Sequence, residues 1–189
     1  FITSEEQRAG SRDYYWRATG KHPGGGAETV DIPFVAYERA HRTRRRPPDG
    51  ASSWCLDTLT LATWLGYYIS EGSGARLGTK GFKLGICQTT PGEDEVPTGT
   101  TAHMVQVSEA LARTGIASLS VRRSRRWTRG GRNAWSITLA SKSLHAWVTA
   151  RAGFGSHDKR IPREVFGWTR EAQQALMDAM IAGDGHQAG

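Results

Sequence analysis

Two segments of this 189-residue chain run apolar residues at helical spacing into an acidic residue that glycine follows. The first, LGYYISEG, covers residues 65–72 and places Glu71 before glycine; the second, AMIAGDG, covers 179–185 and does the same with Asp184. Burying an unpaired charge costs several kcal/mol, so a core helix has no use for a lone carboxylate at its end. The two acids therefore need partners, and this need constrains the fold more than any other feature.

The same two segments also place small residues in matching positions. Each has a small residue five and one positions before its acid: Gly66 and Ser70 before Glu71, and Ala179 and Gly183 before Asp184. Small residues four apart on one face let two helix backbones approach closely. We expect the helices to cross tightly there, with their acids side by side. Like charges that close resist joint ionisation unless a cation lies between them, and such oxygen ligands suit Mg²⁺.

Hydrophobic periodicity predicts the other elements. Helices are expected at 56–70, 100–114, 142–151 and 171–185, and strands at 75–78, 82–89, 117–127 and 132–140. Asp57 is a candidate N-terminal cap of the first helix. Residues 1–50 are rich in glycine, proline and charge, so we expect loops there with one or two short strands. Consecutive hairpins with helices on one face indicate an α+β fold with an antiparallel sheet.

The strand pair within 117–140 separates its side chains into an apolar face and a polar face. The polar face would carry Ser118, Ser120, Arg122, Ser124 and Arg126 from the first strand, Arg132, Ser136 and Thr138 from the second, and Lys83 from the preceding hairpin. Arg123 and Arg125 alternate to the apolar face, so we expect strand twist or fraying to turn them outward. Two-stranded ribbons enter the DNA major groove, which favours DNA contact for the polar face over plain solvation.

The net charge and the clustering of arginines also favour contact with nucleic acid. The net charge is +7, the isoelectric point is about 9.8, and arginines cluster in HRTRRRPP (41–48) and RRSRRWTRGGR (122–132). Clustered basic charge attracts polyanions, of which nucleic acid is the commonest. For 41–48 we expect an arm that touches phosphates rather than reads bases. A solvated basic surface is the alternative reading of the same composition.

Several classes of protein are disfavoured. The two cysteines, Cys55 and Cys87, have no CxxC spacing, and the six histidines are scattered, so a disulfide framework, a zinc site and a histidine-built metal site are not expected. No apolar run reaches the roughly 20 residues of a membrane span. We expect a cytoplasmic, intracellular protein of bacterial or phage type, and Phe1 in place of Met suggests a cut end.

Both acid-tipped segments resemble the LAGLIDADG motif of homing endonucleases, of the dodecapeptide (DOD) type often embedded in inteins. LGYYISEGS (65–73) is similar to the first copy and LMDAMIAGDG (176–185) to the second. KRIPREVF (159–166) is similar to the Lys-x-Ile-Pro stretch that leads into the second motif. The resemblance divides the chain into an irregular basic segment (1–54), a first repeat (55–167) and the start of a second repeat (168–189).

This resemblance implies a specific site. In the family the motif helices pack together, their final acids bind divalent metal at the scissile phosphates, and saddle-shaped antiparallel sheets lie in the major groove. Carried over, Glu71 and Asp184 would be the catalytic metal ligands, with Mg²⁺ as the cofactor. Lys159 would polarise the attacking water or stabilise the phosphorane charge. We expect in-line displacement assisted by two metal ions.

The chain also departs from the family pattern, which leaves several alternatives open. Only five residues follow Asp184, so a second sheet is missing; we expect a fragment or degenerate copy that cleaves poorly unless another chain completes it. Residues 1–50 would be the tail of a self-splicing intein domain, with the host protein as a partner in cis. The function expected is site-specific cleavage of double-stranded DNA. The alternatives are a non-cleaving DNA- or RNA-binding module, such as a regulator or splicing maturase, and a basic interaction domain whose acids are incidental.

Overall fold

The computed structural model describes residues 26–36, 46–74, 82–90, 96–124, 133–155 and 157–184. Its strands are β1 (Thr29–Pro33), β2 (Ser53–Asp57), β3 (Gly72–Gly74), β4 (Lys83–Thr90), β5 (Ser118–Ser124) and β6 (Asn133–Ala140). Its α-helices are α1 (Thr58–Glu71), α2 (Gly99–Arg113), α3 (Lys142–Ala152) and α4 (Arg170–Gly183). Two short 3-10 helices, η2 (Pro48–Gly50) and η3 (Arg163–Gly167), complete the order. The predicted α+β fold is confirmed.

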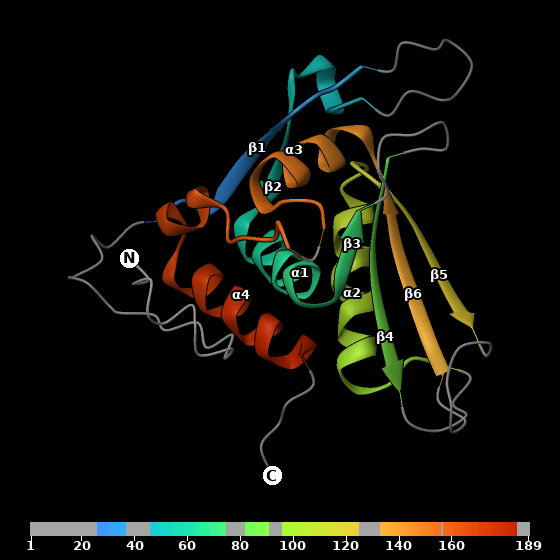
Figure 1. Ribbon diagram of the computed structural model, residues 1–189. Coiled ribbons are helices and arrows are strands. Elements are labelled where there is room, and N and C mark those ends of the chain that lie inside the picture. Colours follow the sequence, from blue (N-terminus) through green and yellow to red (C-terminus); the bar gives the residue numbers. More distant parts are fainter. Residues whose placement is uncertain are drawn as a thin grey trace.

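The main sheet is antiparallel and has four strands in the order β3-β4-β6-β5. Helices α1 and α2 pack against one of its faces, and no helix in the described ranges covers the other (Figure 1). Alternate residues on the covered face, such as Leu84, Ile86 and Ile137, are about 1% exposed. The sheet is therefore of the half-solvated antiparallel kind, with one apolar and one open face.

Helix α1 lies at the centre of the molecule, between the sheet and α4 (Figure 1). Asp57 caps its N-terminus, because the carboxylate accepts a hydrogen bond from the amide of Thr60 at 2.7 Å. The helix ends before Gly72, whose backbone is extended with φ −81°. Glycine is needed there because a β-carbon would overlap the carbonyl oxygen of Tyr68, not because of a left-handed conformation.

Helix α4 lies along α1 and buries only one side of itself. The hydroxyl of Thr169 accepts a hydrogen bond from the amide of Ala172 at 3.2 Å and so caps its N-terminus. Its buried side faces α1 and consists of Ala172, Leu176, Ala179, Met180 and Gly183. The second acid-tipped helix is thus packed on the first, as predicted.

The start of the first helix differs from the prediction. Leu56 belongs to strand β2 and not to the first helix, because β2 pairs with β1 and places Leu56 opposite Val30. Trp54 and Leu56 are both buried while the residues beside them are less so, which is the period of a strand. The other predicted elements agree within a residue or two, except that β5 ends at Ser124, and the predicted strand at 75–78 lies outside the described residues.

Among the described residues, the structure contains no helix of the length and apolar character that crossing a lipid bilayer requires.

Candidate metal and nucleic-acid site

The crossing of α1 and α4 is built from the small residues of both helices. A β-carbon added to Gly66 would overlap the carbonyl oxygen of Leu176 and lie 2.7 Å from the β-carbon of Ala179. One turn further along, a β-carbon added to Gly183 would overlap the hydroxyl of Ser70 and lie 3.0 Å from its β-carbon. At Gly66 the obstructing atom belongs to the backbone of α4, so glycine is required there, whereas at Gly183 the helices meet through the small side chain of Ser70.

Ser70 is compatible with this crossing because its hydroxyl turns back onto its own helix. The hydroxyl donates to the carbonyl oxygens of Gly66 and Tyr67, both at 3.2 Å. A serine that hydrogen-bonds to the preceding turn leaves no polar group unsatisfied at a helix interface. The side chain is thus small and satisfied at the position where Gly183 approaches.

The crossing brings two carboxylates to the same end of the helix pair. Glu71 is the last residue of α1 and is half-buried, while Asp184 is the C-terminal cap of α4 and is exposed. Partial burial, and then the negative charge of Asp184, raise the pKa of Glu71, and the positive charge of Lys159 lowers it. Asp184 and Lys159, to which the resemblance also gives catalytic roles, therefore both lie within electrostatic range of Glu71.

Lys159 lies beside this carboxylate pair. It belongs to the segment between α3 and η3 and is half-buried. Its ammonium group is 5.5 Å from the centre of the Tyr68 ring, on the helix that ends in Glu71. A cation that close to an aromatic face gains on the order of 1 kcal/mol of attraction.

The carboxylate pair has the chemistry of a site for a hydrated divalent cation. Both acids stand at helix C-termini, where the aligned peptide dipoles add partial negative charge, and neither helix has a basic residue in its last turn. The donors are oxygens, which Mg²⁺ and Mn²⁺ accept. No group of three acidic, histidine or cysteine side chains able to hold a metal occurs within the described ranges. Two carboxylates fit a cation that keeps waters and a phosphate oxygen in its shell.

The open face of the sheet carries the polar residues that alternation predicted. Lys83, Ser120 and Arg122 are exposed, and Ser136 and Thr138 are partly exposed. The strand register aligns these residues across the sheet: Ser120 pairs with Thr138, and Arg122 pairs with Ser136. Ser124 is the last residue of β5 and pairs with Ala134. Arg126, Arg132 and the arginine run 41–45 lie outside the described residues.

Arg123 remains on the apolar side of the sheet, contrary to the expected outward turn. It pairs in register with Trp135, which is 5% exposed, and is itself half-buried. Strand alternation therefore governs its direction, because β5 is still regularly paired at this position. Arg125 lies outside the described residues.

Sequence analysis missed a contact that Gln88 makes near the end of β4. Its side-chain amide donates to the carbonyl oxygen of Gly183 at 3.3 Å and so connects the sheet to the last turn of α4. The residue shares the covered face with Leu84 and Ile86. A polar residue that interrupts an apolar alternation was the signal that could have revealed it.

Cys87 connects the open face to the carboxylate pair. It is exposed and pairs in register with Ser136. Partial burial and the charge of Glu71 raise the pKa of the Cys87 thiol, so the acid lies within electrostatic range of this face. Gly72, which follows Glu71, pairs in register with Ile86, which precedes Cys87, so Glu71 lies near this strand position.

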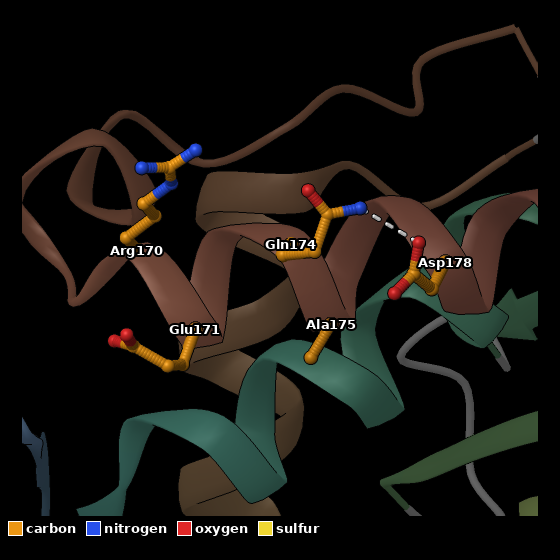
Figure 2. Close-up of a pocket in the computed structure, with 5 residues that line it drawn as sticks. All are labelled: Arg170, Glu171, Gln174, Ala175 and Asp178. Carbon is orange, nitrogen blue, oxygen red and sulfur yellow. Dashed lines mark hydrogen bonds between the residues drawn. The ribbon is translucent and has the colours of Figure 1, made fainter.

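A shallow hollow on α4 is separate from this site. Figure 2 shows its lining residues, which all come from α4: Arg170, Glu171, Gln174, Ala175 and Asp178. The side-chain amide of Gln174 donates to the carboxylate of Asp178 at 2.7 Å. None of the predicted site residues lines the hollow, and a single helix face does not enclose a ligand.

Comparison with known proteins finds a likeness in structure but no match in sequence. No protein-family model matches the chain. No curated protein matches it either. Among solved structures, a variant of I-DmoI in complex with its target DNA, nicked in the coding strand and in the presence of manganese, is similar over 67% of this chain and 62% of that chain, less than two thirds of its length. The sequence identity is 14% and the TM-score is 0.42.

Proposed function

We propose that this chain is the DNA-binding and DNA-cleaving part of a metal-dependent, site-specific endonuclease of the LAGLIDADG type. One observation carries the proposal: the tight α1–α4 crossing brings Asp184 within electrostatic range of Glu71, and Lys159 acts on the same carboxylate. A structural helix pair gains nothing from two like charges at one end, because the charge of Asp184 raises the pKa of Glu71 and so the cost of ionising it. Binding a cation removes that cost.

In this proposal Glu71 and Asp184 hold a divalent cation, Mg²⁺ or Mn²⁺. When bound, the cation polarises a phosphate oxygen and lowers the pKa of a bound water. The two carboxylates orient that cation from the ends of rigid helices, which limits its freedom of position. Lys159 places a positive charge where the pentacovalent phosphate develops negative charge, and so stabilises the transition state.

The open face of the sheet supports a duplex as the substrate. Lys83 and Arg122 supply positive charge for phosphates or base edges, and Ser120, Ser136 and Thr138 supply hydroxyl donors and acceptors. The electrostatic effect of Glu71 on Cys87 supports a position of this acid near the open face. A duplex bound across the strands would thus bring a backbone phosphate toward the carboxylates.

A nicking assay tests the proposal. Supercoiled plasmid carrying a randomised insert is incubated with the chain and Mg²⁺ or Mn²⁺, and with Glu71→Gln and Asp184→Asn variants. We expect slow nicking by the unchanged chain and a loss of about 10²-fold or more in either variant, since each acid would be a metal ligand. Asp178→Asn on the outer side of α4 is the matched control and should nick normally. Equal background in all four chains would contradict the proposal.

One observation favours a second function, a LAGLIDADG-type module that binds DNA or RNA without cleaving it. The basic and hydroxyl side chains on the open face, such as Arg122 and Ser120, do not include either acid, so they would serve binding without cleavage. Replacing Glu71 and Asp184 by amides would then leave nucleic-acid affinity and biological activity intact. The intein host and the completing second half remain predictions, which the gene sequence on both sides of this segment tests.

A further inference from the structure

The position of Lys159 depends on how the chain turns after α3. Gly153 directly follows that helix with φ +85°, and a β-carbon there would overlap the carbonyl oxygen of Asp158 and lie 3.1 Å from the amide nitrogen of Lys159. Only glycine allows both the conformation and the close approach. The residue before Lys159 is therefore packed directly against the end of α3.

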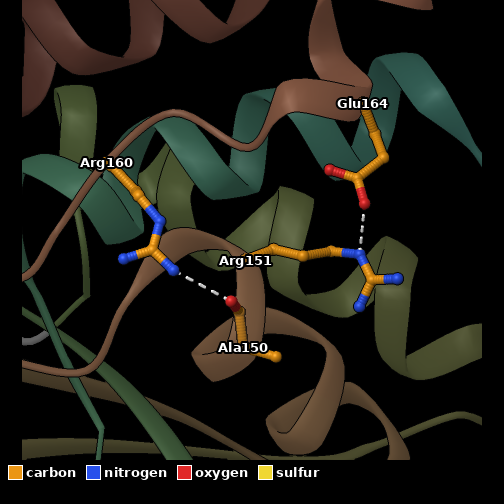
Figure 3. Close-up of polar contacts among 4 residues, drawn as sticks. All are labelled: Ala150, Arg151, Arg160 and Glu164. Atoms are coloured by element: carbon orange, nitrogen blue, oxygen red, sulfur yellow. Dashed lines mark hydrogen bonds and ion pairs between the residues drawn. The ribbon is translucent and has the colours of Figure 1, made fainter.

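The residue after Lys159 is tied to the same helix end. The amide of Arg160 donates to the carbonyl oxygen of Ala152 at 2.9 Å, and its guanidinium donates to that of Ala150 at 3.0 Å (Figure 3). Figure 3 also shows Arg151 of α3 paired with Glu164 of η3 at 2.5 Å. The two hydrogen bonds from Arg160 satisfy carbonyl groups that a helix C-terminus otherwise leaves unpaired. The backbone on both sides of Lys159 is thus held against the end of α3.

Tyr68 connects that end of α3 to α1. Its hydroxyl donates to the carbonyl oxygen of Gly153 at 3.1 Å, and its ring lies 5.5 Å from the ammonium group of Lys159. The side chain is 0% exposed and stacks on Trp64, with ring centres 5.4 Å apart and planes at 15°. Tyr68 stands three residues before Glu71, so a rigid ring on α1 touches the lysine while the same helix ends in the acid.

We propose that Tyr68 is a positioning residue that sets the distance between Lys159 and Glu71. The inference rests on the proposed nuclease function, in which both residues act on one phosphate. Tyr68 does not itself reach the phosphate, because it is fully buried. It acts through Lys159 in two ways, since its hydroxyl anchors the turn and its ring supports the ammonium group.

Filling space in the core does not require the hydroxyl of Tyr68. Phenylalanine would fill the same space without requiring a hydrogen-bond partner, and a buried hydroxyl that loses its partner is destabilising. Burial raises the pKa of Tyr68 to about 12, so the hydroxyl stays a donor at every pH at which the protein would function. Tyr67 is a natural contrast, because its hydroxyl is 2.7 Å from Nδ1 of His103 on α2.

The test compares Tyr68→Phe with Tyr67→Phe. The second variant removes a tyrosine hydroxyl from the neighbouring position of the same helix. Nicking rates are measured at saturating and limiting plasmid, and nuclear magnetic resonance follows the side-chain methylene shifts of Lys159 and hydrogen exchange at the Arg160 amide. For Tyr68→Phe we expect kcat to fall about 10- to 100-fold, the scale of a misplacement near 1 Å, with KM unchanged. We also expect shifted Lys159 signals and faster exchange at Arg160. Tyr67→Phe should leave all of these near wild type.

A double variant separates positioning from general damage. Tyr68→Phe in a Lys159→Ala background should cause no further loss of kcat, because the two residues act as a unit. Additive losses of kcat would overturn the inference about Tyr68 and leave the proposed function standing. Unchanged Lys159 signals in a Tyr68→Phe chain that still nicks normally would do the same. A wild-type chain that fails to nick would overturn the proposed function instead, and the positioning role of Tyr68 with it.

Discussion

Gly66 faces the carbonyl oxygen of Leu176 across the α1–α4 crossing, with no room for a β-carbon between them. The contact is between two backbones, so no side-chain rotation can relieve it. It lies one helical turn and a residue before Glu71, and it therefore determines how near the two acid-bearing helix ends come to each other.

Gly66→Ala is expected to destabilise the protein. Helix propensity alone would favour alanine by about 1 kcal/mol. Overlap with backbone atoms of Leu176 outweighs that gain, because overpacked interfaces typically cost about 1–3 kcal/mol. We expect a net loss in the free energy of unfolding of about 1–3 kcal/mol, measured by urea denaturation with an unchanged m-value.

Gly167→Ala is the matched control for this change. A β-carbon at Gly167 meets no atom within 4 Å, so the effect should stay within about 0.5 kcal/mol. If Gly66→Ala proved as stable as the wild type, the helices would not cross as closely as the structure shows.

Divalent cations should stabilise the wild-type chain through Glu71 and Asp184. A ligand that binds only the folded state at a hundred times its Kd adds about 2.7 kcal/mol. We expect Mn²⁺ to raise the Tm of the wild type, with a much smaller rise in Asp184→Asn and a normal rise in Asp178→Asn. Differential scanning calorimetry at several Mn²⁺ concentrations measures this. A similar rise in all three proteins would place the cation elsewhere.

The stability of the metal-free protein should depend on pH through Glu71. Burial and Asp184 raise the pKa of Glu71 above its ordinary value of 4.5, so the folded state binds more protons than the unfolded state between these two values. Stability from this group is fully present below pH 4.5 and is lost as pH rises through the folded-state pKa. Glu71→Gln does not titrate there, so its stability relative to the wild type should be greater at pH 7 than at pH 4. Urea denaturation in a chelating buffer at both pH values checks this; a constant difference would contradict it.

Arg122 should contribute to DNA affinity in a salt-dependent way. Each phosphate contact releases counterions, so removing one reduces the slope of log K against log salt concentration by about 1. We expect Arg122→Ala and Lys83→Ala each to weaken binding of a duplex and to lower this slope. Arg113→Ala on α2 is the control, because its side chain is 72% exposed and stands on the helix that covers the opposite face of the sheet. Fluorescence anisotropy at four salt concentrations gives the slopes, and equal slopes for all variants would exclude the open face as the binding surface.

The sequence predicted the helix crossing because its cause is local. Small residues four apart, such as Gly66 and Ser70, define one face of a helix whatever else the chain does. The open sheet face was predictable for the same reason, since strand alternation sorts residues by position. Arg123 shows that this alternation continues further toward the turn than we expected.

The contacts that the sequence did not predict are of a different kind. Gln88 and Tyr68 both donate to backbone carbonyls, those of Gly183 and Gly153, which are far away along the chain. Every residue has a carbonyl group, so no residue pattern marks these acceptors. Strand β2 was missed because Leu56 fits the period of a strand and of a helix equally well, and only pairing with β1 decides between them.

Anomalous diffraction from crystals of this chain soaked in Mn²⁺ tests the central claim most directly. If Glu71 and Asp184 share a cation, the anomalous difference map should show a peak within about 2.5 Å of a carboxylate oxygen of each residue. That peak should be lost from crystals of the Glu71→Gln, Asp184→Asn double variant. A map without a peak between the two carboxylates, from crystals that show Mn²⁺ bound at another site, would contradict the claim.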